Sequence, residues 1–141
     1  MNQDTKEQLL KKANEICSNT LMETLEITFV DVGRDYLVAK MPVSPKVHQP
    51  DGVLHGGASV ALAESVGSAA SYMFLDAENF MIRGLEISAN HVKSVRTGCV
   101  YAKASILHKG RTTQLWQIRI TNEEDQLISL VKLTTIALPK S

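Results

Sequence analysis

Residues 48–71 read HQPDGVLHGGASVALAESVGSAAS, and the rest of the predicted fold is built around this segment. Its beginning carries proline, aspartate and glycine, which are typical of a loop. Residues 58–75 contain no proline and are rich in alanine, serine and glycine, with apolar side chains all round the helical wheel. A helix that is apolar on nearly every side must be buried on nearly every side. The stretch therefore predicts one long central helix, entered from a loop and enclosed by the rest of the chain.

Strand-like segments lie on both sides of the expected helix. Before it, residues 25–32 and 36–41 flank a turn at 33–35 and read as a β-hairpin. After it, short turn signals separate longer runs of strand-like sequence, which predicts an antiparallel meander. These runs are residues 80–95, 100–108, 113–121 and 127–137.

The N-terminal region adds one more element. Residues 5–18 place apolar side chains at helical spacing, with Thr5 as the expected N-cap. The predicted fold class is α+β, with a curled antiparallel sheet wrapped around one long central helix and an extra N-terminal helix. The length of 141 residues predicts a single domain over residues 1–141.

The composition narrows the class of protein. Fifteen acidic and fifteen basic residues balance, so no net charge favours binding to nucleic acid or to an anionic membrane. The polar N-terminus and the lack of a long apolar stretch predict a cytoplasmic protein with no signal peptide and no membrane span. Cys17 and Cys99 are far apart in the sequence, which predicts free thiols.

The start of the expected helix is a candidate binding site. Gly56 and Gly57 lie where the loop enters the helix, so their backbone N–H groups have no acceptor within the helix. Glycine lets a ligand oxygen approach the backbone closely, and the helix N-terminus is partially positive. Such a site can stabilise the oxyanion that forms when a carbonyl carbon is attacked.

Glu64 is the candidate catalytic group. It is a charged residue in an otherwise small and apolar run, where burial of an unpaired carboxylate is costly. A desolvated carboxylate is a stronger nucleophile or base. Ser68 follows four residues later on the same helical face, where its hydroxyl can orient the carboxylate or a water. The alternative interpretation is an ordinary solvent-facing glutamate on a helix.

Glu64 and the glycines at the helix start lie far apart along the predicted helix. Glu64 follows the glycines by seven or eight residues, a rise of roughly 11–12 Å. One chain cannot readily bring its own Glu64 to its own helix start. Two such helices in antiparallel, symmetric contact would bring each Glu64 toward Gly56 of the other chain. The spacing therefore predicts a homodimer with two composite sites.

The same stretch closely resembles the hotdog-fold acyl-CoA thioesterases. The similarity is to the branch that includes the Arthrobacter-type 4-hydroxybenzoyl-CoA thioesterase and 1,4-dihydroxy-2-naphthoyl-CoA thioesterase. It rests on the string His-Gly-Gly at 55–57, with glutamate nine residues after the histidine and glutamine six before it. The segments EISANHVKSV and HKGRTTQLWQI also have counterparts there, so the resemblance covers most of the chain after residue 25.

The resemblance implies a role for each matching residue. Glu64 corresponds to the catalytic carboxylate, which acts as nucleophile or general base on the thioester carbonyl. Gly56 corresponds to the residue whose N–H binds the thioester oxygen, and His55 to one that helps to orient it. Gln49 corresponds to a residue near the thioester and the attacking water, and Ser68 to a hydroxyl that positions that water. The substrate is then an acyl-CoA with an aromatic acyl group, and the homodimers pair into homotetramers.

The resemblance also suggests residues that bind coenzyme A. Gly57 is expected among the residues that bind the substrate or coenzyme A, and His91 and Lys93 correspond to positions near the pantetheine and phosphate entrance. Arg111 and Thr112 follow Gly110 in a turn similar to one that contacts the nucleotide. Ser94 departs from the pattern, because the family often has proline after the basic residue.

Two alternative functions differ from this one in the residues that they require. A hydratase or dehydratase of the same fold typically pairs a histidine with an acidic residue in a His-Phe-Pro context, whereas residues 48–50 here are His-Gln-Pro. A non-catalytic acyl-CoA-binding module is a third possibility, since fold does not fix function. The four histidines show no metal-ligand spacing, so no metal is expected, and no cofactor is expected beyond the coenzyme A of the substrate.

Overall fold

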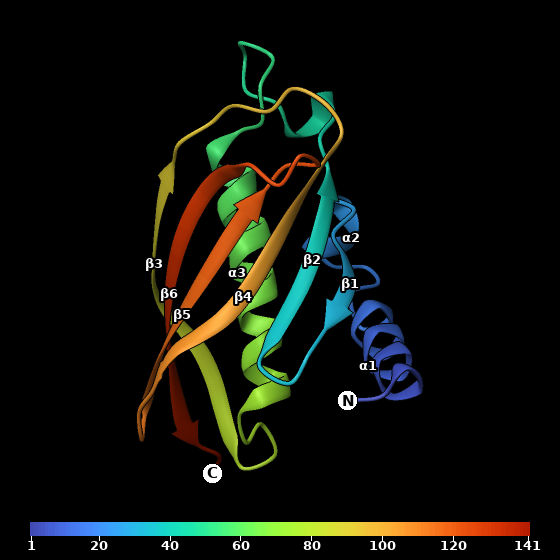
Figure 1. Ribbon diagram of the computed structural model, residues 1–141. Coiled ribbons are helices and arrows are strands. Elements are labelled where there is room, and N and C mark those ends of the chain that lie inside the picture. Colours follow the sequence, from blue (N-terminus) through green and yellow to red (C-terminus); the bar gives the residue numbers. More distant parts are fainter.

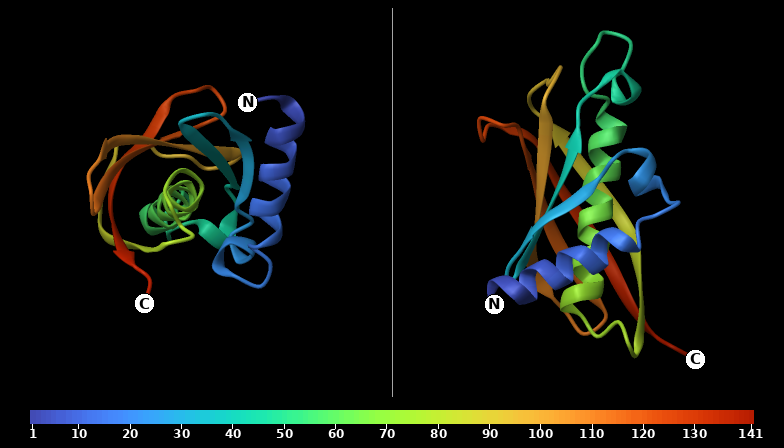
Figure 2. Two further views of the ribbon diagram at one scale, coloured as in Figure 1. Left: turned by 90° about the horizontal axis from the view of Figure 1, so that it is seen from below. Right: turned by 90° about the vertical axis from the view of Figure 1, so that its right-hand side faces the viewer.

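The central helix, α3, runs from Gly56 to Phe74, within two residues of the predicted range. The computed structural model describes residues 1–141 and places α3 on the concave side of a six-stranded antiparallel sheet (Figure 1). Seen from below, the sheet curls round the helix, and the N-terminal helix α1 lies outside the sheet edge (Figure 2). The predicted α+β fold, with a curled sheet round one long helix, is confirmed.

The order of strands in the sheet differs from a simple meander. The strands are β1 (Thr28–Val32), β2 (Tyr36–Pro42), β3 (Phe80–His91), β4 (Cys99–Lys109), β5 (Thr113–Thr121) and β6 (Leu127–Pro139). They lie in the order β1-β2-β4-β5-β6-β3. The predicted meander is correct for β4, β5 and β6 but wrong for β3, which pairs with β6. Residues 92–98 carry the chain across the end of the sheet. The prediction failed here because a turn signal marks the end of a strand but does not indicate which strand the next one pairs with.

Close packing joins α3 to the sheet. Leu62 and Val66 on the helix are fully buried, as are Ile118 on β5 and Leu133 on β6. A Cβ at Gly67 would lie 2.6 Å from Cδ2 of Leu133, closer than packed atoms can approach. Glycine in mid-helix costs about 1 kcal/mol of helix propensity relative to alanine. At position 67 the missing side chain allows the helix to lie directly on the sheet.

The opposite face of α3 is open in the single chain. Glu64 and Tyr72 are exposed, and Ala61, Ser65 and Ser68 are half-buried. The prediction of a helix buried on nearly every side, with Glu64 kept from water, is therefore wrong for one chain on its own. The reason is that the curled sheet covers one side of the helix and reaches no further. A small-residue, apolar helix face that the chain leaves uncovered is typical of an interface.

The N-terminal region differs in detail from its prediction. Helix α1 spans Gln3–Glu15, and its N-cap is Asn2, whose side chain accepts a hydrogen bond from the Thr5 N–H at 2.8 Å. Thr5 is thus not the cap, because the helix begins two residues earlier than expected. A short helix, α2 (Leu21–Thr24), precedes the first strand and was not predicted. A 3-10 helix, η1, spans Pro45–Val47 in the loop before α3.

Polar contacts hold α1 against the edge of the sheet. The Lys6 ammonium lies 3.2 Å from Oδ1 of Asp31, and the Tyr36 hydroxyl donates to Oδ2 of Asp31 at 3.0 Å. Burial alone would raise the pKa of Asp31. The hydrogen bonds from Tyr36 and Lys6 and the lysine charge outweigh burial and hold the pKa of Asp31 below its usual value.

Two further expectations concern the whole chain. Cys17 and Cys99 are free thiols, as predicted, and burial raises the pKa of the Cys17 thiol. None of the helices has the length and apolar character needed to cross a bilayer.

Candidate active site

The first turn of α3 leaves one backbone amide free. The His55 side chain caps the helix, with Nδ1 accepting from the Gly57 N–H at 2.8 Å. The His55 carbonyl accepts from the N–H groups of Ala58 and Ser59 at 3.0 and 3.2 Å. The Gly56 N–H has no acceptor within the chain. Neither glycine N–H has a backbone acceptor within the helix, as expected, but only the Gly56 N–H is free, because the His55 side chain already binds the Gly57 N–H.

The loop before α3 positions Gln49 beside this amide. The Gln49 N–H donates to the Val53 carbonyl at 2.8 Å, and the Gly52 N–H donates to the Gln49 carbonyl at 2.9 Å. Gly52 has φ of 80°, a left-handed conformation that favours glycine. These bonds close a tight turn, and the His55 N–H ties its far end to the Val47 carbonyl at 2.8 Å. The turn therefore holds Gln49 at a fixed place near the start of the helix.

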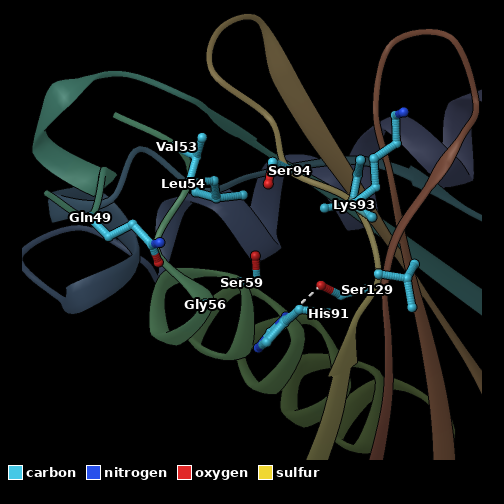
Figure 3. A pocket seen from close by; sticks show the side chains of 11 residues that line it. Gln49, Val53, Leu54, Gly56, Ser59, His91, Lys93, Ser94 and Ser129 are labelled. Atoms are coloured by element: carbon cyan, nitrogen blue, oxygen red, sulfur yellow. Dashed lines mark hydrogen bonds between the residues drawn. The ribbon is translucent and has the colours of Figure 1, made fainter. Parts of the chain in front are cut away.

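A polar cavity of about 290 Å³ lies at this end of α3. Four of the predicted site residues line it: Gln49, Gly56, His91 and Lys93. Figure 3 shows Gln49 and His91 on opposite sides of the start of the helix, whereas the Lys93 side chain extends away from His91. The tertiary structure thus brings together residues from the loop, the helix and the end of β3.

Ser129 on β6 fixes the orientation of His91. Its Oγ lies 2.7 Å from Nδ1 of His91, which leaves Nε2 on the side of the helix start (Figure 3). A Cβ at Gly56 would lie 2.9 Å from that Nε2, so only glycine fits beneath the ring without a shift. Sequence reasoning missed Ser129, because a lone serine in a strand gives no signal of a histidine 38 residues away in the sequence.

Glu64 and Ser68 lie elsewhere, on the open face of α3. They line a second hollow of about 420 Å³, between the middle of α3 and the segment that joins α1 to β1. Glu64 Oε2 would lie 3.1 Å from a Cβ at Gly84, so β3 passes close beside the carboxylate. Eight residues of helix separate Glu64 from Gly56, a rise of about 12 Å. One chain therefore does not bring its carboxylate to its own free amide.

Arg111 and Thr112 lie at the far end of the molecule. They belong to the turn between β4 and β5, and Arg111 lines a hollow of about 150 Å³ with Leu75 and Asp76, which follow α3. The 19 residues of α3 span about 28 Å, so this turn is remote from Gly56 in the same chain. The predicted site residues thus fall into three groups, spread along the helix.

Comparison with known proteins gives the family. A sequence model described as the thioesterase superfamily matches residues 51–129, which include all of α3 and most of the sheet. The chain belongs to the thioesterase superfamily. It is similar to the 1,4-dihydroxy-2-naphthoyl-CoA hydrolase of Escherichia coli K12, with 44% identity over 92% of this chain and 94% of that protein. It is also 40% identical to the proofreading thioesterase EntH of Cronobacter sakazakii, over 92% of this chain and 93% of the relative.

Solved structures agree with this membership. A crystal structure of a mutant thioesterase from Pseudomonas aeruginosa superposes with a TM-score of 0.90 at 40% identity, covering 93% of this chain and 94% of the other. A thioesterase from Haemophilus influenzae gives a TM-score of 0.89 at 43% identity, covering 92% and 90%. The fold is the hotdog fold, and this member of the thioesterase superfamily is an enzyme that hydrolyses thioesters.

Proposed function

We propose that this thioesterase hydrolyses an acyl-CoA to the free acid and coenzyme A, in two composite sites of a homodimer. The observation that carries the proposal is the pair formed by the free Gly56 amide and the exposed Glu64 carboxylate. Both are unpartnered within the chain, and both lie on α3. Because neither group has a hydrogen-bond partner in its own chain, the amide of one helix and the carboxylate of a second copy are free to act on the same substrate.

The chemistry assigns one task to each group. The Glu64 carboxylate attacks the thioester carbonyl carbon or activates a water that does so, and negative charge develops on the carbonyl oxygen. The Gly56 N–H donates a hydrogen bond to that oxygen, assisted by the partial positive charge of the helix start. Collapse of the intermediate breaks the C–S bond and releases the coenzyme A thiolate, which takes up the proton that Glu64 removed from water. If Glu64 itself attacks, the product of this collapse is an acyl–Glu64 anhydride, and water then hydrolyses it to the free acid and restores the carboxylate. Gln49 and Ser68 position the attacking water, and His55 holds the first turn of the helix in shape.

An antiparallel dimer brings the three groups of residues together. If two α3 helices lie side by side in opposite directions, Glu64 of each approaches Gly56 of the other. The same arrangement brings Arg111 and Thr112 of one chain toward the polar cavity of its partner, where Gly57, His91 and Lys93 would contact coenzyme A. Strand β3 is an edge of the sheet and pairs only with β6, so its outer side is free to pair with a second copy.

The proposed acyl group is aromatic, and the proposed assembly is a homotetramer of paired dimers. Support for the acyl group comes from relatives in Escherichia coli and Listeria monocytogenes that are named 1,4-dihydroxy-2-naphthoyl-CoA hydrolases, at 44% and 42% identity. Both assignments are tested by a hydrolysis screen over aromatic and aliphatic acyl-CoAs and by measurement of the molar mass in solution.

Replacement of the carboxylate tests the mechanism. We expect Glu64→Gln to lower kcat for benzoyl-CoA by about 10²–10⁴-fold, measured as release of free thiol. Glu78→Gln is the matched control, because Glu78 is an exposed carboxylate in the turn after α3. A Glu64→Gln protein that turns over at the wild-type rate contradicts the catalytic assignment. Hydration of an enoyl-CoA by the wild-type protein, without thiol release, would point to the hydratase alternative.

Mixing two inactive variants tests the composite site. In a dimer formed from one Glu64→Gln chain and one Gln49→Ala chain, one composite site carries both defects and the other carries none. Equal mixing after reversible dissociation should therefore restore about one quarter of the wild-type activity, because half of the dimers are hybrids. If each site lay within a single chain, every site would keep one defect and the mixture would recover nothing.

A further inference from the structure

We propose that the corner between α1 and α2 forms one wall of the acyl pocket, and that Leu21 sets the size of the acyl group that the enzyme accepts. The inference rests on the proposed function, because it takes Glu64 as the group that meets the thioester carbonyl. It assigns a role to the N-terminal segment, which the catalytic scheme does not use.

The hollow beside Glu64 is apolar except at one side. Ile16, Leu21 and Met22 lie across it from Ala61 and Ala69 of α3. The Ser65 hydroxyl also lines the hollow, but it donates a hydrogen bond to the Ala61 carbonyl at 2.6 Å. The Glu64 carboxylate and the Ser68 hydroxyl have no hydrogen-bond partner in the chain. The volume of about 420 Å³ falls within the range of roughly 300–1,000 Å³ for ligand pockets. The hollow is therefore an apolar chamber with reactive polar groups on one wall.

Large apolar side chains around this chamber are left in contact with water. Ile16 is 72% exposed, Leu21 is 56% exposed, and Tyr72 on α3 is 51% exposed. A single exposed apolar residue needs no explanation, but several gathered round one hollow indicate a binding surface. Covering them with an apolar ligand would be favourable by about 25 cal/mol for each Å² removed from water.

The corner that carries these side chains is held in place before any ligand arrives. The Asn14 side chain donates to the Phe29 carbonyl at 3.0 Å and accepts from the Phe29 N–H at 2.8 Å, so α1 is bonded to β1 as a strand would be. Cys17 is buried, and the Thr20 hydroxyl donates to the Cys17 carbonyl at 2.6 Å. A wall that is already fixed can discriminate by size, because it does not yield to a larger ligand.

The position of Glu64 decides which part of the substrate enters the chamber. The acyl group begins at the carbonyl carbon, which must lie beside the Glu64 carboxylate. From that carbon, in the proposed dimer, the sulfur and the rest of coenzyme A lead toward the second chain's copy of the polar cavity that Gln49 and His91 line. The acyl group must lead the other way, and the apolar chamber adjoins Glu64 there. The position of the carbonyl carbon beside Glu64 and the apolar lining of the chamber therefore place the acyl group against Leu21.

A change of side-chain size at Leu21 tests this wall. We expect Leu21→Trp to lower kcat/KM for 2-naphthoyl-CoA by about tenfold or more, with butanoyl-CoA changed by less than about twofold. Leu21→Ala should shift the preference toward larger acyl groups. Leu107→Trp is the matched control, because Leu107 is 52% exposed on β4 and does not line the chamber. Equal losses for both substrates, or no loss for either, would overturn the proposal.

Binding and mass measurements separate this inference from the proposed function. A thioether analogue of naphthoyl-CoA cannot be hydrolysed, so its affinity reports on the chamber even if the wild-type protein shows no turnover. We expect Leu21→Trp to weaken the naphthyl analogue at least about tenfold more than the butyl analogue. If Leu21→Trp instead changes the molar mass in solution and Leu107→Trp does not, a second chain covers this surface and the proposal is wrong.

Discussion

A methyl group added at Gly84 should displace the Glu64 carboxylate, the proposed catalytic group, without disturbing the fold. A Cβ at Gly84 would lie 3.1 Å from Oε2 of Glu64 and 3.8 Å from Cδ1 of Leu133. The contact with Leu133 is ordinary, whereas the contact with the carboxylate is too tight. Oε2 must therefore move by a few tenths of an ångström. The Glu64 side chain is flexible and exposed, so the movement costs little energy.

The size of the effect follows from this displacement. Misplacement of a catalytic group by about 1 Å costs about 10²-fold in rate, so a few tenths of an ångström should lower kcat about four- to tenfold. Stability should change by less than about 1 kcal/mol, because glycine-to-alanine changes at compatible positions slightly stabilise the folded state. Gly84→Ala should thus separate activity from stability.

Gly67→Ala is the matched control, because it adds the same methyl group on the other side of Leu133. Its Cβ would lie 2.6 Å from Cδ2 of Leu133, inside the core. Overpacking costs about 1–3 kcal/mol, of which the better helix propensity of alanine recovers about 1 kcal/mol. The midpoint of thermal unfolding should fall by several degrees, while kcat of the folded enzyme stays within about twofold of wild type.

The assay for both variants is release of free thiol from benzoyl-CoA at saturating substrate, beside a thermal unfolding curve. Wild-type kcat in a folded Gly84→Ala protein would refute the reasoning, since it would mean that the position of the Glu64 carboxylate does not matter. An equal loss of kcat in both variants would show that general disturbance of the sheet, rather than the carboxylate, is responsible.

Three further predictions concern other parts of the chain. Ser129→Ala should raise KM for the acyl-CoA roughly three- to tenfold with little change in kcat, because His91 loses the hydrogen bond that orients it; an unchanged KM would contradict this role. The folded-state pKa of Asp31 lies below its unfolded value of about 3.9, so its contribution to stability is present above that pH and lost as pH falls through the folded pKa. Urea denaturation between pH 2.5 and 6, over roughly that window, should show this loss in wild type and not in Asp31→Asn. Cys99 is half-buried and Cys17 is buried with a raised pKa, so iodoacetamide should label Cys99 at least about tenfold faster in the folded protein, read by mass spectrometry of tryptic peptides.

Local sequence pattern was enough to predict the central helix and the turn that precedes it. The proline-free run of small residues specifies α3, and the loop with Gly52 specifies the turn before it, because helix propensity and turn chemistry depend on neighbouring residues. The string at residues 55–57 with Glu64 indicated the family. The helical rise of about 12 Å between Gly56 and Glu64 was also available from sequence alone, and with it the expectation that one chain does not complete the site.

Contacts between residues far apart in the chain became known only from the three-dimensional fold. No local pattern encodes the three contacts that join distant segments. These are the pairing of β3 with β6, the hydrogen bond between Ser129 and His91, and the bonding of α1 to β1 through Asn14. The structure also showed that Glu64 is open to water in one chain. An apolar helix face predicts that the face is buried, but it does not identify the surface that covers it. The hydrophobic effect is non-directional, so a second chain can cover the face as well as the same chain can.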